Sequence, residues 1–236
     1  MALTVDSEGF PRTVWTLVLE AGQGQRHALE QLCGAYWTPL YSFARRRGSD
    51  TEAAQDEVQG FLLSFLERDS LTRVASDGGR FRAFLLTAFK NHRISSSRRE
   101  RAKKRGGALQ HLSLDWLRAE KGYQAADSAL DAEALYHRQW AVTLLGRVED
   151  KLGERYRATD RGELFDALRP ALRDPDVALD YEVLGARFGM AQGTLRVAVH
   201  RIRSRYAALL REEVLVLVEG SSDIDDELRV LLGAVG

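Results

Sequence analysis

The hydrophobic and polar positions of the chain follow a helical period over most of its length. Apolar residues recur three or four positions apart, which places them on one face of an α-helix. Helices are predicted in this way at 25–47, 51–69, 80–105, 132–157, 161–172, 181–188 and 191–212. Ile94 is expected to pack inward, and Asp160 to cap the helix 161–172, which Pro170 bends or closes. Segment 214–218 fits either the end of a helix or a strand. The chain has four prolines, and hairpin signals are almost absent. The pattern therefore predicts an all-α protein with two helical domains.

Segment 180–212 predicts a helix-turn-helix. A short helix is expected at 181–188, with Gly185 where two helices approach closely and Gly189 at the turn, where glycine can adopt a positive φ. The second helix places basic residues beside its apolar stripe: Arg196, His200, Arg201, Arg203 and Arg205. Such a helix suits the major groove of DNA. The same pattern also fits a helical hairpin with a solvated basic face.

The distribution of charge changes the meaning of a net charge of zero. Residues 80–105 carry ten Lys or Arg and one acid, whereas residues 212–236 carry seven acids and one base. Aromatic residues accompany the basic run, which favours contact with phosphates and stacking on bases. A solvated helix end is the alternative. The clustering of ten basic residues favours nucleic acid as the partner.

Other classes of protein are disfavoured by what the sequence lacks. Cys33 is the only cysteine, so we expect a buried thiol with no disulfide and no thiolate metal cluster. The five histidines are scattered, and no phosphate-binding loop or nucleophile motif is found. We expect no enzyme, no catalytic residues, no metal and no cofactor. Without a long apolar run or a signal peptide, we expect a cytoplasmic protein with no membrane insertion.

The two basic modules resemble a known family in their order and spacing. Segments AYWTPLYSFARRRG (35–48), AAQDEVQGFLLSFL (53–66) and FRAFLLTAFKNHRISSSRR (81–99) resemble region two of sigma-70-type RNA polymerase sigma factors of the extracytoplasmic-function (ECF) group. Residues 181–203 resemble region four. The segments TVWTLVL, KRGG and QWAVTLLGRV look like a variant common among planctomycete-type bacteria.

The resemblance implies a transcription initiation factor with four segments. Residues 1–105 would form the region-two domain, 106–131 a linker, and 132–218 the region-four domain with the helix-turn-helix. The acidic extension 219–236 would either fold back on a basic surface as a self-regulatory element or complete a domain. Its stripe of Ile224, Leu228 and Leu231 favours the second interpretation.

The resemblance also implies partners and contact residues. Core RNA polymerase, through its β′ and β subunits, would be gripped by Glu52, Asp56, Glu57 and Gln59. The −10 element of promoter DNA would be unwound and held by loop 70–80 with Arg80, Arg82, Asn91, Arg98 and Arg99. The −35 element would meet Gln192, Thr194, Arg196, His200 and Arg201. Gln192 and Thr194 would contact phosphate, while Arg196 and His200 reach base edges.

One departure from the family pattern concerns the polymerase-facing helix. An acidic cluster is common where this chain reads Ala53-Ala54-Gln55-Asp56. One hypothesis is that a partner or phosphorylation at Ser49, Thr51 or Ser64 restores negative charge there. The regulatory partners considered are an anti-sigma factor and a Ser/Thr kinase. The rival interpretation of the whole chain is a stand-alone helix-turn-helix regulator that binds duplex DNA tightly without polymerase.

Overall fold

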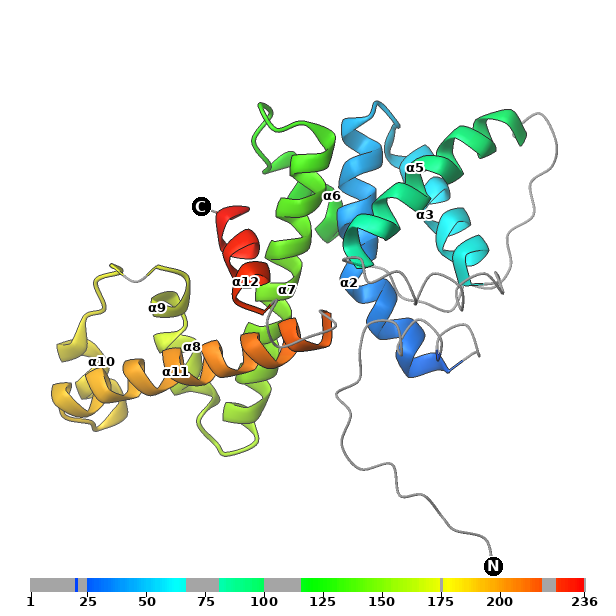
Figure 1. Ribbon diagram of the computed structural model, residues 1–236. Coiled ribbons are helices and arrows are strands. Elements are labelled where there is room, and N and C mark those ends of the chain that lie inside the picture. Colours follow the sequence, from blue (N-terminus) through cyan, green and yellow to red (C-terminus); the bar gives the residue numbers. More distant parts are fainter. Residues whose placement is uncertain are drawn as a thin grey trace, which may run out of the picture. The chain divides into compact units, whose positions relative to one another are not determined.

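The computed structural model describes residues 20, 25–66, 81–99, 116–174, 176–217 and 224–235. All regular secondary structure in these ranges is helical, which confirms the all-α prediction (Figure 1). The chain separates into two compact units. Unit 1 comprises Met1–Thr143 and Leu215–Gly236, and unit 2 comprises Leu144–Val214. The described helices include none that is both long and apolar enough to cross a membrane.

Unit 1 is built around the helices α2 (Arg26–Arg46), α3 (Thr51–Leu66) and α5 (Phe81–Arg99). Their inward faces are aromatic: the ring centroids of Phe61 and Phe89 lie 5.1 Å apart, and those of Tyr36 and Phe81 lie 5.2 Å apart. The Tyr36 and Phe81 rings meet edge to face, and such a pair adds to the stability gained by burying the rings. The Cys33 thiol lies in the same core, as expected, and burial raises its pKa to about 12.

Local chain chemistry fixes where several helices begin and end. Gly48 adopts a φ of 95° just after α2, and Asp50 then accepts a hydrogen bond from the backbone N–H of Ala53 at 2.8 Å. Asp131 does the same for Ala134 at the start of α7 (Ala132–Arg157), at 2.7 Å. These aspartates satisfy N–H groups that have no partner inside the helix.

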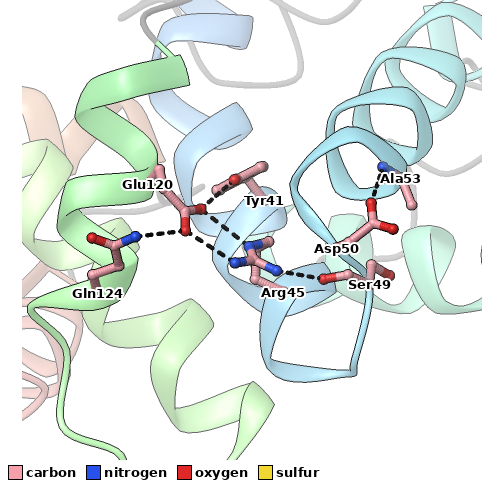
Figure 2. A network of polar contacts seen from close by, with 7 residues as sticks. All are labelled: Tyr41, Arg45, Ser49, Asp50, Ala53, Glu120 and Gln124. Atoms are coloured by element: carbon pink, nitrogen blue, oxygen red, sulfur yellow. Dashed lines mark hydrogen bonds and ion pairs between the residues drawn. The ribbon is translucent and has the colours of Figure 1, made fainter.

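A helix within the expected linker belongs to unit 1. Helix α6 (Trp116–Gln124) packs on α2, and the ring centroids of Trp116 and Trp37 lie 4.9 Å apart. Glu120 accepts hydrogen bonds from Arg45, at 3.0 and 3.1 Å, and from the Tyr41 hydroxyl (Figure 2). The Arg45 hydrogen bond holds the pKa of Glu120 at about 2. The remaining part of the linker, 106–115, lies outside the described residues.

Unit 2 combines the second half of α7 with α8 (Gly162–Leu168), α9 (Pro170–Arg173), α10 (Tyr181–Phe188) and α11 (Gln192–Leu217). The predicted helix 161–172 is interrupted: α8 ends at Leu168 and Pro170 begins α9, in agreement with the expectation that Pro170 bends or closes it. Asp160 was expected to cap α8, and this is wrong: Asp160 takes a φ of 55° and Arg161 stands at the cap position. Segment 214–217 is helical, which resolves the ambiguity between helix and strand.

A buried carboxylate ties unit 2 together. Glu149 of α7, whose side chain is 8% exposed, accepts hydrogen bonds from Arg173 at 2.9 and 3.0 Å and pairs with Arg169 at 3.2 Å. Arg203 of α11 donates to the backbone oxygen of Ala171 at 2.9 Å. Because these contacts join α7, α9 and α11, they fix the position of the helix-turn-helix within its unit.

Candidate nucleic-acid and protein interfaces

The turn of the helix-turn-helix depends on two glycines. Gly189 ends α10 with a φ of 62°, a left-handed conformation that disfavours residues with a Cβ. The backbone N–H of Met190 donates to the Gly185 oxygen at 3.1 Å, and a Cβ on Gly185 would lie only 2.8 Å from the Met190 oxygen. Asp180 accepts from the N–H groups of Glu182 and Val183 at the other end of α10. The positive φ predicted for Gly189 is confirmed. Gly185 was expected where two helices approach closely, but its close neighbour is the backbone of the turn.

The first turns of α11 present a polar and basic surface. Leu195, Val199 and Ile202 are buried against the unit. All the −35 residues named from the sequence are exposed: Gln192, Thr194, Arg196, His200 and Arg201. The Arg196 guanidinium carbon lies 5.2 Å from the ring centroid of Tyr181 in α10, which stacks this side chain beside the turn. Arginines placed in this way on the surface of a helix are available to phosphates and base edges.

Two further arginines of α11 serve the unit itself. Arg203 is bound to the Ala171 oxygen, as described above. Arg205 donates to the Tyr156 hydroxyl at 3.2 Å and lies 5.5 Å from the centroid of the same ring. The basic face predicted from the sequence is therefore divided, because Arg203 and Arg205 contact other residues of unit 2, although Arg205 stays exposed.

Helix α3 carries an acidic face of exposed and half-buried residues. Glu52 and Asp56 are exposed and lie one turn apart. Glu57 is half-buried, pairs with Arg93 of α5 at 2.7 Å and accepts a hydrogen bond from Ser49 at 2.9 Å. Gln59 is half-buried. Of the four residues named for polymerase, the structure leaves the Glu52 and Asp56 carboxylates as exposed charges and engages Glu57 within unit 1.

Arg82 is the clearest departure from the sequence-based expectation. It was expected to face outward from α5, and this is wrong: the residue is 5% exposed. Its guanidinium pairs with Glu227 of α12 (Ile224–Gly233) at 2.5 Å and lies 4.6 Å from the ring centroid of Trp140. The physical reason is that the acidic C-terminal helix covers this part of α5, and no local pattern reveals a partner so distant in sequence.

The other residues named for the −10 element are placed differently. Asn91 is exposed on α5. Arg98 and Arg99 lie in the last turn of α5, and only their backbone is described. Arg80 and loop 70–80 lie outside the described residues. Ile94 was expected to pack inward, but its side chain is 58% exposed.

One comparison with known proteins found a match, in the first part of the chain. A family model described as "ECF sigma factor" matches residues 11–144, which is more than half of the 236 residues. A search of curated proteins and a search of solved structures each found no match. The family match agrees with the all-helical fold and with the region-two resemblance. The chain belongs to the ECF sigma factor family, whose members are non-enzymatic transcription initiation factors that bind core RNA polymerase and direct it to promoters.

Proposed function

We propose that the two units of this sigma factor divide the recognition of a promoter. Unit 2 reads the upstream −35 element through the helix-turn-helix, while α3 and α5 of unit 1 contact the polymerase and the −10 element. The observation that carries the proposal is the exposed basic start of α11, entered by the glycine turn. Touching two promoter elements at once raises the effective concentration of the second contact after the first has formed.

The arrangement of α11 supports specific roles for its residues. Gln192 and Thr194 stand in its first turn, where backbone N–H groups and the helix dipole favour phosphate. Arg196, His200 and Arg201 follow on the exposed surface and supply donors for base edges and phosphates. Replacing one base-reading arginine costs about 1–3 kcal/mol of binding free energy and relaxes specificity at one base pair.

The polymerase-binding role falls on the exposed carboxylates of α3. Glu52 and Asp56 offer two negative charges one turn apart, and Gln59 follows at the next turn. A cationic surface of the polymerase would be attracted to such a face, and a charge reversal there would repel it. We assign to the same proposal the −10 contacts of Asn91, Arg80, Arg98 and Arg99.

Co-elution with bacterial core RNA polymerase tests the proposed function. The wild-type chain is expected to co-elute, and Asp56→Arg is expected to abolish the complex. Glu154→Arg provides a matched control, because Glu154 is an exposed carboxylate on α7 in unit 2. Absence of binding by the wild-type chain, together with tight binding to duplex DNA alone, would instead identify a stand-alone regulator.

The regulatory partner of the α3 face is a further part of this proposal. Thr51 is exposed at the first position of α3. By contrast, Ser49 and Ser64 are half-buried, and their hydroxyls donate to Glu57 and to the Phe61 oxygen. A phosphate on Thr51 would meet the positive end of the helix dipole and add negative charge next to Glu52. These observations favour a Ser/Thr kinase acting at Thr51, while an anti-sigma factor stays a prediction.

A further inference from the structure

The acidic C-terminal helix is seated on unit 1 through a buried ion pair. Glu227 of α12 and Arg82 of α5 lie 2.5 Å apart, with side chains that are 3% and 6% exposed. Leu231, one turn further along α12, is fully buried. Figure 1 shows α12 running beside α7, and Trp140 of α7 also contacts Arg82. The extension therefore covers a basic residue of the helix that we assign to promoter DNA.

Helix α7 makes further contacts with Arg82. The Trp140 ring stacks against the guanidinium at 4.6 Å, and the Tyr136 hydroxyl donates to the Arg82 backbone oxygen at 3.0 Å. Both contacts come from α7, whereas the counter-charge Glu227 comes from α12. A guanidinium binds carboxylates and phosphates with the same planar donor geometry. The Glu227 carboxylate therefore occupies a position that suits a phosphate.

A buried ion pair contributes little net stability to the attachment of a helix. The free energy of desolvating two charges can be as large as that of their attraction. Apolar residues of similar size often stabilise a fold equally well or better. A buried ion pair can, however, be exchanged for another anion without leaving the arginine uncompensated. The chemistry at Arg82 thus suits an exchangeable contact.

We propose that α12 is an intramolecular competitor of DNA, which holds Arg82 through Glu227 in the free protein and leaves when a phosphate of single-stranded DNA takes its place. The proposal rests on the proposed function, because it assumes that α5 meets the −10 element. Departure of α12 would also remove a helix with three acids and one base, Asp225, Asp226, Glu227 and Arg229, from the neighbourhood of the DNA.

Binding of the full chain to single-stranded DNA tests the competition. We would measure the fluorescence anisotropy of a labelled mixed-sequence strand of about 20 nucleotides, from about 50 mM to 200 mM salt. Glu227→Gln is expected to increase affinity about three- to tenfold, because one charge-assisted contact becomes available. The slope of log binding constant against log salt concentration should steepen by about 0.7, the value for one added phosphate contact on a single strand.

Two controls separate this effect from a general change in charge. Asp226→Asn removes the same charge from an exposed neighbour, whose ion-pair partner Arg229 lies on the same helix, and should leave affinity unchanged. Combining Arg82→Gln with Glu227→Gln should remove most of the gain in affinity, because the guanidinium that takes the phosphate is then absent. An equal gain from Asp226→Asn, or a gain that Arg82→Gln leaves undiminished, would overturn the proposal in favour of simple charge repulsion.

A shortened chain, residues 1–223, covers the case in which Glu227→Gln does not fold. It should bind the strand at least as tightly as Glu227→Gln, and its tryptophan fluorescence should report a folded unit 1. A folded variant with wild-type affinity would overturn the proposal. The same preparations are tested for co-elution with core polymerase. Polymerase binding without a gain in DNA affinity refutes only the competition, whereas a gain without polymerase binding refutes only the sigma-factor assignments.

Discussion

The two units carry basic helices of similar composition that differ in how their charges are engaged. In unit 1, Arg82 and Arg93 of α5 pair with Glu227 and Glu57 of the same unit. In unit 2, Arg196 and Arg201 stand exposed at the start of α11. The comparison teaches that a basic run in the sequence marks a potential DNA surface, while the acids packed beside it decide which residues are available.

The difference follows from the cost of burying charge. An arginine packed on an aromatic core needs a counter-charge, because an uncompensated charge in a low-dielectric interior is strongly unfavourable. An arginine on the outer face of α11 keeps its water shell and exchanges it for phosphate or base contacts on binding. We therefore expect substitutions in the two helices to change different properties of the protein.

The largest expected effect is on the stability of unit 1. Arg82→Gln leaves Glu227 buried without its counter-charge and should lower the free energy of unfolding by about 3–5 kcal/mol. Arg47→Gln removes an exposed arginine near the end of α2 and should change it by less than about 0.5 kcal/mol. Urea unfolding followed by tryptophan fluorescence reports on unit 1, because all four tryptophans precede residue 144. Equal effects of the two substitutions would show that Arg82 is solvated.

The second effect concerns the turn that presents the α11 surface. Gly185→Ala places a Cβ 2.8 Å from the Met190 oxygen and should lower the stability of unit 2 by about 1–3 kcal/mol. Gly193→Ala is the control, since no atom lies within 4 Å of its added Cβ and alanine favours a helix by up to about 1 kcal/mol. Far-UV circular dichroism should detect the loss while tryptophan fluorescence stays unchanged. A Gly185→Ala protein as stable as Gly193→Ala would mean that the turn relaxes freely.

The third effect is a dependence of the stability of unit 1 on pH. The hydrogen bond from Arg45 lowers the pKa of Glu120 from 4.5 to about 2 in the folded protein. The stabilisation is therefore fully present above about pH 4.5 and is lost as the pH falls towards 2. Fluorescence should follow the release of α6, because Trp116 packs on Trp37. Glu120→Gln should remove this acid transition, and an unchanged transition would assign it to other carboxylates.

The smallest effect is expected at Thr51. Thr51→Asp adds a negative charge at the N-terminus of α3, and the affinity for core polymerase should rise by up to about fivefold, since one added charge contributes about 1 kcal/mol at most. The asparagine of Thr51→Asn has the shape of aspartate without its charge, so this variant should bind core polymerase with the wild-type affinity. The comparison is made by quantitative co-elution. Equal affinities for all three proteins would exclude Thr51 as the regulated position.

The parts of the fold that depend on residues close together in the sequence could be predicted from the sequence. The helix 181–188 has the predicted bounds, because Asp180 caps its start and Gly189 ends it within the same short segment. Asp160 shows the limit of such rules. Aspartate also tolerates the left-handed conformation that it adopts here, so a favourable capping residue took the turn position instead.

Contacts between distant segments could not be predicted. A helical period shows which face of α5 is apolar but does not show how far its partners extend, and so Ile94 was expected to be buried and is exposed. The acids of 224–227 were visible in the sequence, yet nothing local connects Glu227 with Arg82. For the same reason, the bond from Glu120 to Arg45 was missed within a segment expected to be a linker.

The availability of individual arginines in the wild-type protein tests the central comparison most directly. The folded chain would be treated with phenylglyoxal, a reagent for guanidinium groups, and the modified positions followed over time by peptide mass spectrometry. Arg196 and Arg201 should react rapidly. Arg82 should react at least about tenfold more slowly, because its modification requires local opening of unit 1. Modification of Arg82 as fast as that of Arg201 would contradict the account.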